Sequence, residues 1–126
     1  MNHIQSPRTC DASVEEEILA KGLTAPRITP ADIEANIASE HYFTAAQALV
    51  GDTRGPEWQA TPKALDLLTF CVLELKNGFT VTGESACASP ENFDAEVGRK
   101  IARANAIQKI WPLMGYALRN KLSGAE

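Results

Sequence analysis

The sequence has few of the residues that build disulfide frameworks and metal sites. It contains three cysteines and two histidines in 126 residues, and no CxxC pair is present to begin a zinc site. The three cysteines are also too few and too widely spaced for a disulfide scaffold. We therefore expect no metal and no cofactor.

Long apolar runs are missing as well. No stretch approaches the about 18 apolar residues that a membrane helix needs. The start MNHIQSPRTCDAS lacks the apolar centre of a signal peptide. We expect a cytosolic protein with no membrane partner.

Basic residues are in deficit, with 12 Lys and Arg against 16 Asp and Glu. A nucleic-acid polymer is not an expected partner, because phosphate neutralisation normally leaves a basic footprint. The deficit lies in residues 1–66, with 5 basic against 10 acidic side chains, whereas residues 67–126 have 7 against 6. Any anion site is therefore expected in the second half.

The remaining composition is that of one ordinary globular domain, with 44% apolar and 22% charged residues. We expect a flexible N-terminus at 1–12, a single domain at 13–122 and a frayed tail at 123–126. Glycines and prolines concentrate around a surface loop or insertion at 50–64, from which Trp58 is expected to fold back onto the body.

Helix signals mark the N-terminal part. Ser13 and Glu16 match a capping box, which predicts a short helix that stops near Gly22. A second helix is predicted from the cap at Thr29 to about residue 39, with proline at its first position. After it, 41–44 favours a short strand, whereas 45–50 could equally continue as helix.

A β-hairpin is the clearest local prediction, because Asn77-Gly78 joins two β-rich runs over about 67–87. A two-residue turn places Leu75 opposite Thr80. One face then carries Leu68, Phe70, Val72, Phe79, Val81 and Cys87, and the other carries Leu67, Cys71, Leu73 and Leu75 beside Thr80, Thr82 and Glu84. Cys71 and Cys87 are thus predicted on opposite faces, with no disulfide between them.

A long C-terminal helix is predicted to begin at Ser89-Pro90-Glu91 and to fray after Lys121. Pro112 predicts a kink or a break within it. Its apolar stripe would comprise Val97, Ile101, Ala104, Ile107, Ile110 or Trp111, Met114 and Leu118.

Together these elements predict an α+β fold, in which a short antiparallel sheet built on the hairpin packs one face on the long helix, with the N-terminal helices added. So small a sheet leaves apolar surface uncovered, including Trp111, Met114, Tyr116 and the second sheet face. We therefore expect a homo-oligomer.

The start of the long helix is a candidate anion site, because its first N–H groups lack partners. Phe93 could stack on a base and Asn92 could read its edge, although Phe93 could equally be a core residue. Ser89 could be only a cap, and Glu96, Arg99, Lys100 and Arg103 could be a solvated face. The candidate ligand-binding residues are Arg27, Phe79, Ser85, Ser89, Asn92, Phe93, Arg99, Arg103 and Lys109.

Catalysis is not expected. Cys87 near a helix start could have thiolate character, but His41 would be its only available base. Buried free cysteine is the commoner situation. Gly-rich phosphate loops and the usual hydrolase and metalloprotease motifs are absent. We expect no catalytic residue.

Several motifs occur in order across residues 15–120, apart from the loop region: NGF, SxCxxPxNF, a GxxxA-type helix and KIWPLMGY. They resemble the phage gene-49/gene-66 family of small proteins, which is similar to the first type of Thoeris anti-defence protein. The resemblance implies a sponge in the host cytoplasm that binds glycocyclic ADP-ribose isomers without cleaving them. It also implies sites for cyclic di- or trinucleotides in some members, and a homodimer or hexamer. Where members have an acidic residue between Trp and Leu, this chain has Pro112.

Overall fold

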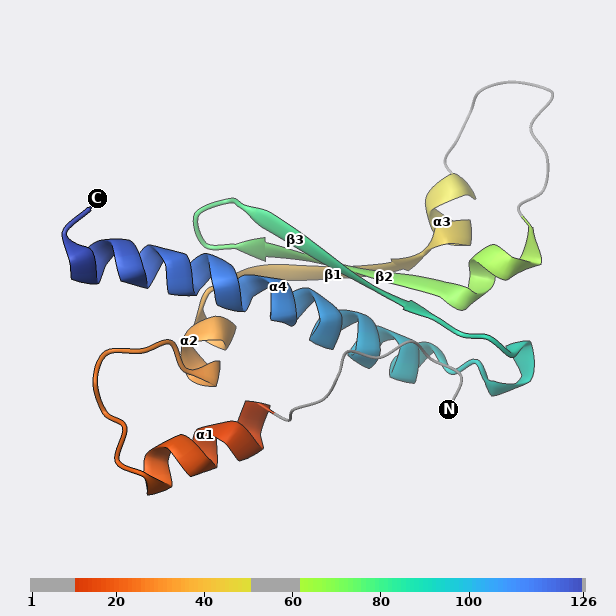
Figure 1. The fold of residues 1–126 in the computed structure, drawn as a ribbon. Coiled ribbons are helices and arrows are strands. Elements are labelled where there is room, and N and C mark those ends of the chain that lie inside the picture. Colours follow the sequence, from red (N-terminus) through yellow and green to blue (C-terminus); the bar gives the residue numbers. More distant parts are fainter. Residues whose placement is uncertain (1–10, 51–61, 126) are drawn as a thin grey trace.

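A three-stranded sheet and one long helix form the body of the protein (Figure 1). The computed structural model describes residues 11–50 and 62–125, so most of the expected loop, with Trp58, lies outside them. The elements are α1 (Asp11–Ala20), α2 (Pro30–Ala35), β1 (Ile37–Thr44), α3 (Ala45–Val50), the 3₁₀ helix η1 (Lys63–Leu67), β2 (Leu68–Leu75), β3 (Thr80–Ala86), the 3₁₀ helix η2 (Pro90–Asn92) and α4 (Ala95–Ser123). The sheet is antiparallel in the order β1-β2-β3, and α4 packs on β2 and β3. The predicted α+β fold is confirmed.

The hydrophobic core lies between α4 and the sheet. Its buried members are Ile33, Cys71, Leu73, Leu75, Val81, Ala102, Ala106 and Ile110. Ile107, Trp111 and Met114 are partly buried and pack against this core. Two of the three side chains expected at a subunit contact, those of Trp111 and Met114, are therefore engaged within the chain, whereas Tyr116 is 72% exposed.

The hairpin forms, but its register differs by one residue from the prediction. The Gly78 amide donates to the Leu75 carbonyl (2.9 Å), and the Leu75 amide donates to the Phe79 carbonyl (2.8 Å). The loop is therefore the three-residue type, with Gly78 in the left-handed region at φ 89°. Leu73 consequently lies opposite Val81 rather than Thr82.

This register corrects the predicted faces, because a slip of one residue moves every side chain of a strand to the other face. Val81 and Cys87 lie on the buried face with Leu73, whereas Thr80 and Thr82 are exposed. Cys71 and Cys87 thus share one face, and both are free and buried. The dipeptide Asn77-Gly78 favours a two-residue turn, whereas the observed register buries Val81.

Small residues let α4 approach the sheet closely. Gly98, Ala102 and Ala106 are buried on the helix face toward β3. A Cβ atom at Gly83 would collide with the backbone of Ala102 and Ala106. The buried face of α4 is therefore rotated about the helix axis relative to the predicted apolar stripe, whose member Val97 is 36% exposed. The prediction assigned the core face to the larger apolar side chains of the helix, whereas close approach of the two backbones requires small residues there.

The ends of α4 also differ from the prediction. The helix begins at Ala95, where the Asp94 carboxylate accepts from the Val97 amide (3.0 Å), while Ser89 precedes η2 instead. It continues through Pro112 without a break and ends at Ser123. Pro112 is exposed, so water can reach the carbonyl that loses its helical partner.

The N-terminal helices are shorter or begin earlier than expected. α1 begins at Asp11 instead of after a cap at Ser13. The cap at Thr29 is confirmed, because its hydroxyl and the Asp32 carboxylate exchange hydrogen bonds with each other's backbone amides (3.1 and 2.9 Å). α2 ends at Ala35 because the chain from Ile37 pairs with β2, and this ladder overrides the helix expected to about residue 39.

Candidate functional site

Arg103, a predicted phosphate contact, is held by two carboxylates. Its guanidinium pairs with Glu34 at 2.7 Å and with Glu40 at 3.3 Å, and its side chain is 26% exposed. Hydrogen bonds from Arg103 hold the pKa of Glu34 below its ordinary value. The pKa of Glu40 is lowered first by the Tyr42 hydroxyl, which donates at 2.6 Å, and then by Arg103. Arg103 therefore ties α4 to α2 and β1.

Arg27 lies in the connection between α1 and α2 and is paired as well. Its two terminal nitrogens donate to the two carboxylate oxygens of Glu15, at 2.7 and 2.8 Å. These hydrogen bonds lower the pKa of Glu15 and raise that of Arg27. Arg27 differs from Arg103 in one respect, because it lines two cavities.

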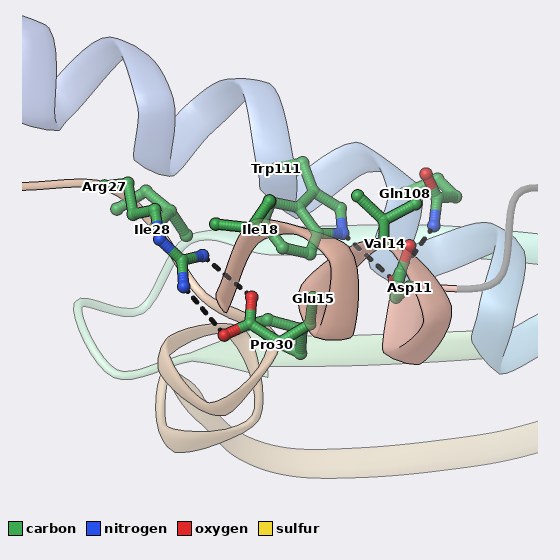
Figure 2. A pocket seen from close by; sticks show the side chains of 9 residues that line it. All are labelled: Asp11, Val14, Glu15, Ile18, Arg27, Ile28, Pro30, Gln108 and Trp111. Carbon is green, nitrogen blue, oxygen red and sulfur yellow. Dashed lines mark hydrogen bonds and ion pairs between the residues drawn. The ribbon is translucent and has the colours of Figure 1, made fainter. Parts of the chain in front are cut away.

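The first cavity, here called the α1 pocket, lies between α1 and α4 and has a volume of about 280 Å³ (Figure 2). It is lined by Asp11, Val14, Glu15, Ile18, Arg27, Ile28, Pro30, Gln108 and Trp111. At one end the Asp11 carboxylate accepts from the Trp111 indole (3.3 Å) and the Gln108 amide (3.4 Å). Figure 2 shows the Arg27–Glu15 pair as a second polar group. Ile18 and Trp111 lie between this pair and the group formed by Asp11 and Gln108.

The second cavity, here called the basic groove, has a volume of about 680 Å³. It is lined by Arg27, Ile28, Asp32, Ala35, Asn36, Lys76, Met114, Ala117, Leu118 and Lys121. The lining thus contains three cations and one carboxylate together with apolar side chains. Among the residues that the structure describes, neither Lys76 nor Lys121 forms an ion pair.

The α1 pocket and the basic groove adjoin, since Arg27 and Ile28 line both. Their combined lining offers an indole ring, side-chain amides, three cations and three carboxylates, and one of these carboxylates, that of Glu15, is paired with Arg27. Volumes of this order are usual for small-molecule sites, whose polar groups are few and set in apolar walls. The arrangement suits a ligand that has both a flat ring and anionic groups.

The nine predicted ligand-binding residues do not gather in one place. Phe93 and Arg99 meet in a third cavity of about 380 Å³ beside the start of α4. Ser85 is buried in the sheet, and Phe79, which directly follows the hairpin loop, is 55% exposed. The others are Ser89 and Asn92, which lie in the segment before α4, Lys109, which is exposed on α4, and Arg27 and Arg103 as described.

The expectation of an open helix start is corrected by the same geometry. The Asp94 carboxylate caps α4, so an acidic group already occupies the amide end where a phosphate was expected. Sequence reasoning missed Lys76, Lys121 and Gln108, which converge only through the tertiary fold. Of these three residues, only Lys76 had a local signal for its position, because it directly precedes the turn dipeptide Asn77-Gly78.

Residues 11–50 and 62–125 contain neither a membrane-spanning helix nor a metal-binding cluster. No helix there is both long and apolar enough to cross a bilayer. Within those ranges no cluster of three His, Cys, Asp or Glu side chains could hold a metal ion.

Comparison with known proteins gives a family. Searches of the curated proteins and of the solved structures found no match. The family model of the phage protein (N4 Gp49/phage Sf6 gene 66) family matches residues 28–122. The match contains the whole sheet and nearly all of α4, whereas α1 and Arg27 precede it. The chain therefore belongs to the phage protein (N4 Gp49/phage Sf6 gene 66) family.

Proposed function

We propose that this phage protein binds and sequesters cyclic nucleotide immune signals in the host cytoplasm without cleaving them, and so blocks bacterial Thoeris-type signalling. The ligands would be glycocyclic ADP-ribose isomers and, as the resemblance implies for some relatives, cyclic di- or trinucleotides. The supporting observation is the pair of cavities that share Arg27. Such ligands combine flat bases with phosphates, which are the two features that this lining complements.

In this proposal each cavity takes one part of the ligand. A base lies in the α1 pocket against the Trp111 ring, where Asp11 and Gln108 can pair with its polar edge. The phosphates lie toward the basic groove, between Arg27 and the two lysines, Lys76 and Lys121. Cations from three separate parts of the chain thereby surround one anionic group.

Sequestration rather than cleavage is favoured by the chemistry of the lining. The described residues that line the two cavities include no histidine, cysteine, serine or threonine. Cleavage of a phosphate or glycosidic bond needs a positioned base, acid or nucleophile. The three carboxylates in the two linings are already engaged: Glu15 is ion-paired with Arg27 and has a lowered pKa, Asp11 accepts from Trp111 and Gln108, and Asp32 accepts from the Thr29 amide.

The same ion pair affects affinity. A phosphate that binds Arg27 must share the guanidinium with Glu15 or displace it, so part of the interaction energy is offset. Glu15→Gln should therefore tighten binding of a phosphate-bearing ligand.

Isothermal titration with a glycocyclic ADP-ribose isomer and with a cyclic dinucleotide tests the proposal. Loss of a hydrogen bond to a charged group costs about 1.5–3 kcal/mol, or about 10- to 150-fold in affinity, which we expect for Arg27→Gln and Lys76→Gln. Arg119→Gln is the matched control, because Arg119 is exposed on α4 and lines neither cavity.

The outcomes separate the function from the site. If the wild-type protein binds none of these ligands at about 100 μM, the function is wrong. If it binds but Arg27→Gln and Lys76→Gln behave like Arg119→Gln, the site is wrong. Recovery of intact ligand after heat denaturation is expected, and recovery of cleavage products would contradict sequestration.

Self-association as a homodimer or hexamer is part of the proposal. Leu113 and Tyr116, three residues apart on α4, are 40% and 72% exposed, and such apolar side chains favour a protein contact. The alternative function, binding of a host protein without a small ligand, would use the same surface. Light scattering after size exclusion tests self-association: Tyr116→Lys should shift an oligomer toward monomer, and a monomeric wild type would contradict it.

A further inference from the structure

The third cavity lies away from the proposed nucleotide site, and it contains two predicted residues that this site does not use. It is lined by Tyr42, Phe43, Thr44, Gln47, Asp66, Thr69, Phe93, Ala95 and Arg99, with a volume of about 380 Å³. We call it the β1-edge pocket, because β1 is an edge strand of the sheet. None of its residues lines the α1 pocket or the basic groove.

A buried hydroxyl in the β1-edge pocket has no hydrogen-bond partner within residues 11–50 and 62–125. Thr69 is 3% exposed, and among the residues that the structure describes none bonds to its hydroxyl. The Thr44 hydroxyl, at the paired position of β1, accepts from the Gln47 amide instead. Buried polar groups are nearly always paired, so an unpaired one that lines a cavity points to a ligand atom or water.

Two opposite charges lie in the same lining without being paired to each other. Arg99 is exposed on the first turns of α4, and Asp66 is exposed in η1. No ion pair forms at either residue within the described ranges. A ligand with an anionic group and a hydrogen-bond donor would satisfy both.

Aromatic rings supply the rest of the wall. Tyr42 and Phe93 line the cavity. Phe43 also borders it, but its ring stacks on that of Phe70 on the other face of the sheet, at 5.4 Å between centroids. The Tyr42 hydroxyl already donates to Glu40, so this residue offers the pocket chiefly its ring. Rings held in this way suit a flat aromatic ligand.

We propose that the β1-edge pocket is a second ligand site, which takes a planar aromatic ring bearing one anionic group and a hydrogen-bond donor. Arg99 binds the anion, Asp66 accepts from the donor, and the Thr69 hydroxyl bonds to a polar atom of the ring. Amino-substituted aromatic acids and guanine mononucleotides share this chemistry. The proposal does not depend on the cyclic nucleotide function.

Titrations of the full chain followed by NMR test the proposal, with 4-aminobenzoate, benzoate, GMP and guanosine as probes. We expect 4-aminobenzoate or GMP to shift the resonances of Thr69 and Phe93 and to leave those of Trp111 unchanged. Benzoate lacks the donor and guanosine lacks the anion, so each should bind less tightly than its counterpart. If neither 4-aminobenzoate nor GMP shifts Thr69 and Phe93 at about 1 mM, the proposal is wrong.

Three variants test the assigned roles. Arg99→Gln should weaken binding about tenfold or more, the usual loss for a charge-assisted contact, and its neighbour Lys100→Gln, which does not line the pocket, should not. Thr69→Val removes the hydroxyl but keeps the side-chain shape, and it breaks no hydrogen bond within the described residues, so it should weaken binding several-fold without lowering the melting temperature. Unchanged affinity in Arg99→Gln, or a lower melting temperature in Thr69→Val, would overturn the proposal, because the cation would be unused or the hydroxyl would be paired in the protein.

Discussion

The close contact between β3 and α4 makes Gly83→Ala the most informative single substitution. A methyl group at this position would overlap sterically with the Ala102 carbonyl oxygen and the Ala106 amide nitrogen, far inside van der Waals contact. Both obstacles are backbone atoms inside a continuous helix, so neither can rotate away. The helix must instead move outward from the sheet, which loosens the buried contacts around Leu73 and Val81.

The expected cost follows from that displacement. Overpacking of a well-packed core costs about 1–3 kcal/mol, and backbone obstacles place Gly83→Ala at the upper end, about 3 kcal/mol. For a chain of this size each kcal/mol lowers the melting temperature by about 3–5 °C, so a decrease of about 9–15 °C is expected. Thermal unfolding followed by circular dichroism, with urea titration as a second assay, measures both quantities.

Gly115→Ala is the matched control, because the same substitution should have the opposite sign. Gly115 lies within α4, and a Cβ there meets nothing within 4 Å. Alanine is favoured over glycine inside a helix by about 0.5–1 kcal/mol, so this variant should be slightly more stable than wild type. If Gly83→Ala loses less than about 1 kcal/mol, below the usual overpacking range, the close approach of β3 and α4 is refuted.

Three further predictions follow from charge, backbone conformation and burial. The pKa values of Glu34 and Glu40 are lowered in the folded state, so the stability that they contribute is present above the unfolded pKa and is lost as the pH falls through the folded values. Melting temperatures from pH 7 to pH 3 should therefore decline less steeply in Glu34→Gln than in wild type, and parallel curves would contradict the Arg103 pairing. Gly78→Ala should cost about 1 kcal/mol in urea unfolding, because Gly78 has φ 89°, and an unchanged midpoint would contradict the three-residue loop. Burial raises the pKa of the Cys71 thiol, so iodoacetamide should label Cys71 only after denaturant is added, as mass spectrometry of the labelled peptide can show.

Local signals in the sequence predicted the parts of the fold that depend on near neighbours. The cap at Thr29 needs only Asp32, three residues away, and the hairpin needs a turn dipeptide between two β-rich runs. The long amphipathic segment predicted α4 for the same reason, although not its start or its buried face. The start is set by the cap at Asp94, a local signal that the prediction passed over in favour of Ser89-Pro90, whereas the buried face depends on the contact with Gly83.

The sequence by itself thus determined the type and order of the elements, whereas only the tertiary structure decided the hairpin register and the roles of the charged residues. Burial of Val81 against α4 outweighed the preference of the turn. Arg103 and Arg27 appeared equally available for a phosphate. The fold pairs both with carboxylates, Glu34 for Arg103 and Glu15 for Arg27, but it places only Arg27 at the junction of two cavities. Partners 69 residues apart in the chain carry no local signal, so their pairing becomes visible only when packing sets the distance between them.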